Sequence, residues 1–472
     1  MPELASDVVV LGGGGAGLAT AARAAELGLS VTVLERADRI GGTTGQAVGS
    51  IAAAAGGPPD SPDLHARDII ALSSEGTAGH DVLLHAYVRA APATLAWLRS
   101  LGIEFLDPVH DDGSSARRLY NALPHAAIYV RTLEQRLRSL GGQVHTGFTA
   151  SRLLREGDRV VGVVGHARDG QEIVHRARCA VVLATGDFSG NDDLKQQHLG
   201  MAYPPINPHN DGSGFALATD VGGVTRSPGQ AGWAPELRFV APSGSSLLRR
   251  VPPSRGMSRM LGHLADRAPR RVFGAAVSAL STTYLAPSPS VQDRGAVLLS
   301  GGGNPVSWVS GFDNGLVPGE SYAVVFDRDA TRAFEEPDAF VSTAPGIAYA
   351  TLADYRRFRR DLWHACATTE DVAARLWARV DRVAEALTGR SGPFVVLGPA
   401  RAVQILTDGG LEVDESLRVL TDQGAPVPGL YAAGAAGQSS MVLPGHGNHL
   451  GWALTSGRLA AEHLRRHEGD RR

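Results

Sequence analysis

The chain opens with an apolar pattern that predicts a strand, a helix and a second strand in close succession. Residues 7–11 form an apolar run, which passes through several glycines into an alanine-rich stretch over about 15–27. A second apolar run covers residues 30–35 and ends in an acid, Glu35. Short continuous apolar runs indicate buried strands, and a longer alanine-rich stretch between them indicates a helix. We interpret this segment as one βαβ unit.

The pattern downstream predicts more elements of an α/β protein. Helices are expected around residues 80–100 and 129–140. Further strands are expected at 152–156, 159–166, 179–184, 411–414, 417–420 and 429–433, before a closing helix over 447–466. Between about 232 and 395 the sequence becomes rich in Pro, Ser, Gly and Arg, with less regular periodicity, which is typical of an inserted domain.

Composition narrows the class of protein. A chain of 472 residues that is 43% hydrophobic can bury the core of two or three domains. Its 45 basic and 48 acidic residues leave a net charge of −3, so we expect a small-molecule substrate and no nucleic-acid partner. Cys179 and Cys366 are the only cysteines, which favours a reducing compartment and argues against a disulfide framework or a metal site. No apolar run approaches the roughly 20 residues of a membrane span, and we expect a cytoplasmic protein.

The glycine run after the first strand gives the clearest indication of a ligand-binding site. Gly12, Gly14 and Gly17 occupy the positions of a GxGxxG motif between an apolar strand and a helix, and Gly15 and Ala16 lie within it. Such a turn brings helix amides close to a pyrophosphate, while an acid at the end of the second strand accepts bonds from ribose hydroxyls. That context predicts dinucleotide binding, with Glu35 and Arg36 at the second strand's end. NAD and FAD share this motif, and the second glycine-rich turn, Gly41-Gly42-Thr43-Thr44, favours FAD.

These residues and several later stretches resemble the flavoprotein family that contains fumarate reductase, succinate dehydrogenase and the 3-ketosteroid dehydrogenases. The similar stretches are GGGGAGLAT, GGTT, ATGDFSGN (184–191), DGSGFALATDVGG (211–223), TDGGLEVDESLRVL (407–420), and GLYAAGAAG through HGNHLGWALTSGRLAAE (429–462). The resemblance implies an α/β fold: a Rossmann-like FAD-binding domain split between residues 1–231 and 396–472, with an α+β cap, 232–395, inserted between the two parts. FAD is expected to be bound non-covalently, because the GGTT segment holds no histidine.

The same resemblance implies further cofactor contacts. Thr185, Gly186, Asp211 and Gly434 lie in the stretches that line FAD in the family. The closing helix is expected to point the amides of Asn448, His449 and Leu450 at the flavin ring, where the positive end of a helix stabilises the reduced, anionic ring.

Departures from the family pattern bear on the substrate. The fumarate reductases carry an arginine in the segment that here reads Asn448-His449-Leu450-Gly451, and a histidine where this chain has Leu406. The ketosteroid dehydrogenases carry a tyrosine where this chain has Leu443. Ala435 stands where relatives carry a polar residue. We therefore expect a substrate other than fumarate or succinate.

Several side chains are candidates for the acid/base that such a reaction needs. His446 and His449 flank the start of the closing helix, and an imidazole titrates in the useful range, although both could instead serve only as caps. Tyr284 and Tyr120 are weaker candidates, because a lone tyrosine is more often a packed aromatic. Arg294 could bind a substrate carbonyl or form a surface ion pair. The arginine-rich segment 249–271 could act as a solvated lid or receive an anionic substrate.

The sequence thus predicts an FAD-dependent oxidoreductase that dehydrogenates, or in reverse reduces, the C–C bond next to a ketone or carboxyl group of a small cyclic or bulky substrate. A separate electron acceptor or donor is implied, because the chain holds no haem or iron–sulfur motif. Two alternatives remain open at this point: a flavin oxidase or aromatising dehydrogenase of secondary metabolism, and a catalytically degenerate protein that binds FAD for structure.

Overall fold

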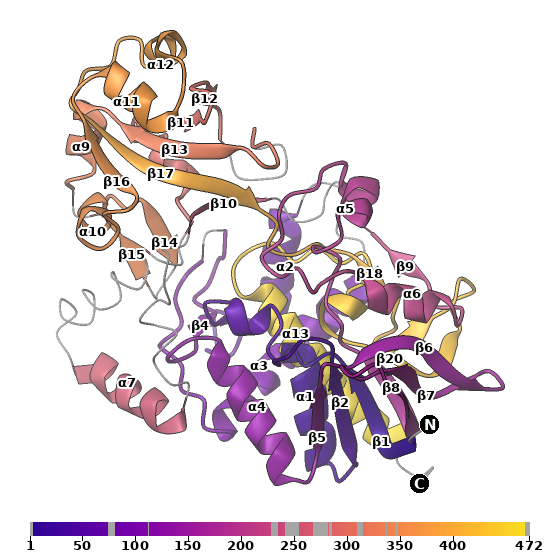
Figure 1. Cartoon of the computed structure of the whole chain (residues 1–472). Coiled ribbons are helices and arrows are strands. Elements are labelled where there is room, and N and C mark those ends of the chain that lie inside the picture. The colour runs from indigo at the N-terminus through magenta and orange to yellow at the C-terminus, as the bar shows by residue number, and fades with distance from the viewer. Residues whose placement is uncertain are drawn as a thin grey trace.

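The computed structural model describes two lobes, each built on its own β-sheet (Figure 1). It describes residues 3–73, 81–111, 113–227, 235–240, 254–267, 282, 286–308, 315–336, 338–344 and 348–467. The first lobe holds both ends of the described chain, and the second lobe is formed by its middle part.

The first lobe is organised around a largely parallel eight-stranded sheet. Its strands follow the order β19-β20-β8-β1-β2-β5, and the hairpin β6–β7 joins β8. The strands are β1 (Glu3–Leu11), β2 (Val31–Glu35), β5 (Gln143–Thr146), β6 (Thr149–Glu156), β7 (Arg159–His166), β8 (Glu172–Leu183), β19 (Arg418–Leu420) and β20 (Pro426–Ala432). The β1-helix-β2 unit and the predicted strands at β6, β7, β8, β19 and β20 are confirmed, although β8 begins at Glu172 rather than at 179. β5 was not anticipated, and of the strand predicted at 411–414 the structure has only Gly410–Leu411, which lies outside this sheet.

Strand pairing joins the two ends of the chain into one sheet. β8 pairs in parallel with β1 along one edge, and Leu430 of β20 pairs with Val181 on its other edge. Val8, Val9 and Val10 of β1 are fully buried, as expected of a strand covered on both faces. The predicted split of the Rossmann-like domain between the N- and C-terminal segments is therefore confirmed.

Five helices pack in this lobe and bring the C-terminal segment against the N-terminal one. They are α1 (Gly15–Glu26), α2 (Pro62–Leu72), α3 (Asp81–Ser100), α4 (Ala127–Ser139) and α13 (Asn448–His467). α1 packs against α4 and α13, α13 also packs against α3, and α2 packs against α3. A Cβ on Gly457 of α13 would collide with the carbonyl oxygen of Ala16, so the two helices touch backbone to backbone. The predicted helices around 80–100, 129–140 and 447–466 are confirmed, whereas α2 was not anticipated.

The second lobe is an α+β unit with an antiparallel sheet of order β10-β17-β13-β11-β12, and β16 pairs with β17. Its strands are β10 (Glu236–Phe239), β11 (Val297–Ser300), β12 (Pro305–Val306), β13 (Ser321–Phe326), β16 (Trp363–Cys366) and β17 (Phe394–Val403), and its helices are α9 (Arg328–Ala333), α10 (Leu352–Phe358), α11 (Thr369–Leu376) and α12 (Val380–Ala386). The expected domain boundary at residue 396 falls inside β17, and we propose that the return to the first lobe follows Val403.

The other helices and strands of the described chain belong to neither of these two sheets. They are β3 (Ser50–Ala52), β4 (Leu119–Asn121), α5 (Asp192–Leu199), α6 (Ser213–Thr219), β9 (Thr225–Arg226), α7 (Arg255–Arg267), β14 (Ser342–Ala344), β15 (Ala348–Ala350), β18 (Gly410–Leu411) and the 3-10 turns η1 (Thr44–Gln46), η4 (Pro289–Val291) and η5 (Gly434–Gly437). Within the described residues, no helix is long and apolar enough to cross a membrane.

The carboxyl ends of the parallel strands bring the candidate cofactor residues to one edge of the sheet. β1 ends before Gly12, β2 ends at Glu35, β8 ends before Thr185, and β20 ends before Gly434. In open α/β sheets, ligands bind at this edge, beside the central strand where the connections diverge.

Candidate active site

The first glycine turn is shaped to admit a ligand at the N-terminus of α1. The amide of Gly12, which has a φ of 104°, donates to the carbonyl of Leu34 at 2.8 Å, so this residue continues the pairing of β1 with β2 before the chain turns into α1. The N-cap of α1, Gly14, has no side chain to cap the helix, and a Cβ there would meet no protein atom within 4 Å. The helix therefore presents its positive end to open space, which is the arrangement that binds a pyrophosphate.

The second glycine turn lies directly against the first. The Gly41 amide donates to the carbonyl of Gly13 at 2.9 Å, and Thr44 Oγ1 accepts from the amide of Gly15 at 3.2 Å. Gly42 lies against Gly14. The structure thus brings together the two segments that the sequence separates by more than twenty residues.

Acidic and basic side chains at the end of β2 hold neighbouring loops. The Glu35 carboxylate accepts from the amides of Gly13, at 2.7 Å, and Ala37, at 2.8 Å. Arg36 pairs with Asp211 at 2.5 Å and also donates to the carbonyl of His209. Burial acts to raise the pKa of Asp211, but hydrogen bonds from Arg36 and Ser213 outweigh it and lower that pKa. Arg36 and Asp211, two predicted cofactor residues, therefore form an ion pair with each other.

The segment after β8 is held by a buried polar cluster that sequence reasoning missed. Thr43 Oγ1 accepts from the side-chain amides of Asn207 and Asn210, each at 3.1 Å. Asn210 also donates to Asp187, whose pKa burial raises despite its hydrogen bonds. Thr185 packs against Gly214, and Gly186 packs against Asn210. No motif in the sequence singles out the two asparagines, because only the fold brings them next to the GGTT turn.

Together these features fit a bound dinucleotide. The open space at Gly14, the N-terminus of α1 and the acid at the end of β2 supply the groups that a pyrophosphate and a ribose require. Gly434, just after β20, packs on Ala16. The indole of Trp452 donates to the carbonyl of Gly434 at 2.9 Å, so α13 packs against the same edge of the sheet.

His449, in the first turn of α13, is paired with a buried carboxylate. Its Nε2 lies 2.8 Å from Oδ1 of Asp408, whose side chain is 0% exposed, whereas that of His449 is 16% exposed. Gln438 also donates to Asp408 Oδ1. The other oxygen, Oδ2, is buried and has no hydrogen-bond partner among the described residues. Asp408 and Gln438 were missed as site residues, although Asp408 lies in the quoted TDGG stretch.

His446 forms a second, more exposed pair. Its Nδ1 lies 2.7 Å from Oδ1 of Asp111, and its backbone amide donates to Oδ2 of the same carboxylate at 2.8 Å. The His446 side chain is 58% exposed and that of Asp111 is 9% exposed. Asp111 therefore ties the turn before α13 to the loop before β4.

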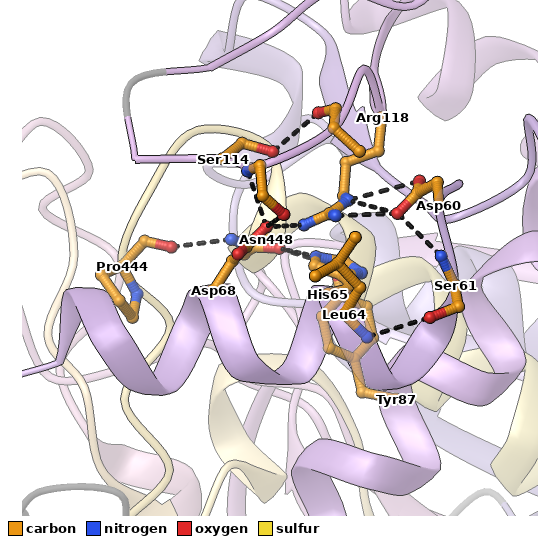
Figure 2. Close-up of polar contacts among 12 residues, drawn as sticks. Asp60, Ser61, Leu64, His65, Asp68, Tyr87, Ser114, Arg118, Pro444 and Asn448 are labelled. Carbon is orange, nitrogen blue, oxygen red and sulfur yellow. Dashed lines mark hydrogen bonds and ion pairs between the residues drawn. The ribbon is translucent and has the colours of Figure 1, made fainter. Parts of the chain in front are cut away.

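The Asn448 side chain turns into the protein, where its polar atoms bond to protein groups (Figure 2). His65 Nε2 lies 3.0 Å from Asn448 Oδ1, the Tyr87 hydroxyl donates to the same oxygen at 3.3 Å, and Asn448 Nδ2 donates to the carbonyl of Pro444 at 2.7 Å. Any cofactor contact of Asn448 is therefore left to its backbone amide. The neighbouring Leu450 is half-buried and packs against the core of the first lobe.

An ion cluster lies beside this group. Arg118, which is 3% exposed, pairs with Asp60 at 2.7 Å and with Asp68 at 2.5 Å. Burial and, second to it, the charge of Arg118 lower the pKa of His65 to about 4, so His65 is neutral at pH 7.

The remaining candidates that the structure describes contact other protein side chains. Tyr120 is buried in β4 beneath the guanidinium of Arg99, 5.1 Å from its ring, and burial raises its pKa. Arg294 forms an exposed ion pair with Glu336 at 3.2 Å in the second lobe. Tyr284 and most side chains of the segment 249–271 lie outside the described residues. No group of three or more His, Cys, Asp or Glu side chains that could hold a metal ion occurs in the part of the chain that the structure describes.

Comparison with known proteins agrees with this arrangement. The profile of a family described as an FAD-binding domain matches residues 7–450. The chain is 27% identical to a 4-oxocyclohexanecarboxylate 2-dehydrogenase of Sinomonas cyclohexanicum, and the match covers 97% of this chain and 92% of that protein.

Solved structures share the fold. A flavocytochrome c3 fumarate reductase in an open conformation superposes with a TM-score of 0.74 at 18% identity, over 99% of this chain and 79% of that one. The 3-ketosteroid-Δ4-(5α)-dehydrogenase of Rhodococcus jostii RHA1 superposes with a TM-score of 0.66 at 20% identity, over 98% of both chains. The resemblance and the fold class predicted from the sequence are confirmed.

Proposed function

Because the chain belongs to this FAD-binding family, and is an FAD-dependent oxidoreductase of CH–CH bonds, we propose that it interconverts a small cyclic ketone with the corresponding enone. His449 serves as the acid/base in this proposal. The observation that carries it is the contact between His449 and the fully buried Asp408 in the first turn of α13.

The cofactor site defines what the chain's own residues do. Bound FAD supplies a two-electron acceptor and donor of hydride. The amides at the start of α1 would hold its pyrophosphate, and Glu35 would accept from its ribose. The backbone amides of residues 448–450 precede the first hydrogen bond of α13, from Gly451 to the carbonyl of Gly447 at 2.9 Å, and they face the flavin ring.

The pair with Asp408 prepares His449 for proton transfer. A carboxylate only accepts hydrogen bonds, so His449 donates from Nε2 to Asp408, which leaves Nδ1 as the nitrogen that would exchange a proton with the substrate. Dehydrogenation removes a proton from the carbon next to the carbonyl, which Nδ1 accepts, while the hydride leaves the adjacent carbon. In the reductive direction, Nδ1 returns that proton. Asp408 holds the ring in one tautomer and one orientation throughout.

The substrate class rests on two observations. A relative that spans nearly the whole chain acts on 4-oxocyclohexanecarboxylate, a six-membered ring with a ketone and a carboxyl group. Leu406 and His449 replace the histidine and arginine that the resemblance to fumarate reductases would require. Both favour a cyclic ketone over an open-chain dicarboxylate.

Anaerobic titration of the FAD-loaded protein tests this proposal. We expect the flavin absorbance to bleach with 4-oxocyclohexanecarboxylate or with cyclohexanone, and to stay unchanged with succinate. In His449→Ala and Asp408→Asn, the flavin spectrum should persist while the bleaching rate falls by about 10² to 10⁴-fold. His446→Ala, on the more exposed pair, is the matched control and should change that rate by less than about tenfold.

Three outcomes would redirect the proposal. Bleaching of His449→Ala at the wild-type rate would remove His449 from the reaction. Rapid reoxidation of the substrate-reduced protein by oxygen would favour a flavin oxidase. A protein that dithionite reduces but that no cyclic ketone, carboxylate or enone affects would favour a degenerate flavoprotein.

A further inference from the structure

We propose that His65 is a positioning residue, which acts through Asn448 to aim the first turn of α13 at the flavin ring. The proposal rests on the function proposed above, because it takes the backbone amides of residues 448–450 to face that ring. It adds a residue of α2 that no motif in the sequence marks.

The contacts of Asn448 make it the point through which the start of α13 is held. His65 from α2 and Tyr87 from α3 both reach its Oδ1, while its Nδ2 is bonded to the carbonyl of Pro444 in the preceding turn (Figure 2). Asn448 is 5% exposed and His65 is 2% exposed. Rotation of the Asn448 side chain would break these buried hydrogen bonds. The bonds therefore fix the side chain of Asn448 and, with it, the orientation of its backbone amide.

The bond from His65 requires one protonation state and one tautomer. The Asn448 amide oxygen only accepts, so His65 must carry its proton on Nε2. Its Nδ1 is buried and has no hydrogen-bond partner among the described residues. An unpaired buried nitrogen costs free energy that an apolar side chain at this position would avoid, so packing alone does not account for a histidine here.

Arg118 supports this state from the other side. Its guanidinium, held between Asp60 and Asp68, disfavours a second proton on His65. The backbone carbonyl of Arg118 also accepts from the amide of Ala53 at 3.0 Å, and the amide of Ala52 donates to the carbonyl of Gly447 at 3.2 Å. The cluster is thus joined to the turn before α13 by the backbone as well as through His65.

Sulfite affinity of the bound flavin is a suitable readout. Sulfite adds to oxidised flavin and leaves negative charge on the ring, so its affinity reports how well the helix end stabilises that charge without any substrate. We expect His65→Leu in the FAD-loaded full chain to bind sulfite about fivefold more weakly than wild type. His65→Gln keeps an N–H donor and should restore the affinity to within about twofold. His175→Leu is the matched control, a buried histidine in the N-terminal half of β8, which should leave sulfite affinity unchanged.

A double substitution tests whether His65 acts through Asn448. If it does, His65→Leu should have no further effect on sulfite affinity in an Asn448→Leu background. Additive effects of the two substitutions, wild-type sulfite affinity in His65→Leu, or an equal loss in His175→Leu would each overturn the inference. Failure of the proposed function looks different, because wild-type protein would then show no flavin spectrum, or no bleaching with any cyclic ketone despite normal sulfite binding.

Discussion

Glycine is needed at two positions of the first turn, Gly14 and Gly17, for different reasons. A Cβ on Gly17 would collide with the carbonyl oxygen of Gly12, so this glycine is required by the packing of α1 on β1. A Cβ on Gly14 would meet no protein atom within 4 Å, and the φ of Gly14, −79°, suits any residue. The folded chain alone gives no reason for a glycine at position 14, whereas a ligand at the end of α1 does.

Gly14→Ala should therefore separate cofactor binding from folding. We expect the melting temperature of the FAD-free protein to stay within about 2 °C of wild type, because the added methyl group meets no protein atom within 4 Å. FAD affinity should fall by at least about tenfold, because the new methyl group occupies the space of the pyrophosphate. Gly17→Ala is the comparison and should lower both quantities. Unchanged FAD affinity in Gly14→Ala, measured by fluorescence titration, would contradict the placement of the cofactor.

His65 should also make the protein sensitive to acid. Its pKa is about 4 in the folded chain, through burial and the charge of Arg118, against an ordinary value of 6.5. Between pH 6.5 and 4 the unfolded chain binds a proton that the folded chain does not, so the free energy of unfolding falls as the pH drops through this window. The loss is a few kcal/mol at most.

The variant His65→Gln, which cannot titrate there, tests this expectation. Its melting temperature should fall less than that of wild type between pH 7 and pH 5. His175 and His463, whose pKa values burial also lowers to about 4, should preserve part of the fall in both proteins. If the melting temperatures of His65→Gln and wild type fall equally between pH 7 and pH 5, His65 titrates at its ordinary pKa.

Among the elements, the contact between α1 and α13 determines the geometry of the site. Both helices begin at the cofactor edge, α1 with the glycine turn and α13 with Asn448 and His449. Gly457 lets the two backbones touch, and a Cβ there would also lie 3.0 Å from the Cβ of Ala19. The position of α13 relative to the nucleotide turn therefore depends on Gly457, which touches Ala16 of that turn but lies more than two turns along α13 from Asn448.

Gly457→Ala should disturb both folding and the cofactor site. We expect a loss of about 1 to 3 kcal/mol in unfolding free energy, because overpacking forces the helices apart. FAD affinity should fall with it, since the start of each helix moves. Arg465→Ala, in the exposed last turn of α13, is the control and should change stability by less than about 0.5 kcal/mol. Equal stability of the two variants in urea unfolding would show that the helices tolerate a wider spacing.

Across the whole molecule, the lobes do not follow the sequence boundaries closely. Tyr203 precedes the expected cap by almost thirty residues, yet it is 1% exposed within the core of the second lobe. Its hydroxyl donates to the carbonyl of Leu316 at 2.7 Å. The backbone nearby also pairs with the chain that leaves β17, through bonds that join Gln404 to Pro204 and Ile206. The segment around Tyr203 therefore fastens the second lobe to the first.

Tyr203→Ala should loosen that attachment and leave the nucleotide turn intact. Removing a buried aromatic ring costs about 3 to 5 kcal/mol, and the cost should fall on the second lobe. We expect faster limited proteolysis within residues 286–403, with the flavin spectrum retained. Tyr203→Phe keeps the ring and loses only the hydroxyl bond, so its proteolysis should stay close to that of wild type. Loss of FAD in Tyr203→Ala would show that the two lobes are stabilised as one unit.

The sequence by itself determined the βαβ unit, most later strands of the first lobe, the helices α3, α4 and α13, and the glycine turns that indicate FAD. These features depend on local pattern: apolar periodicity, residues without a Cβ, and an acid at the end of a strand. It also marked His446 and His449 as candidates, because both flank a predicted helix end. The tertiary structure decided how these residues are used. Asp408 and His65 lie far from α13 in the chain, and only packing brings them to its first turn, as it brings Asp111 to His446 in the preceding turn. Periodicity reports which face of an element is buried, but it does not report which distant side chain lies opposite that face.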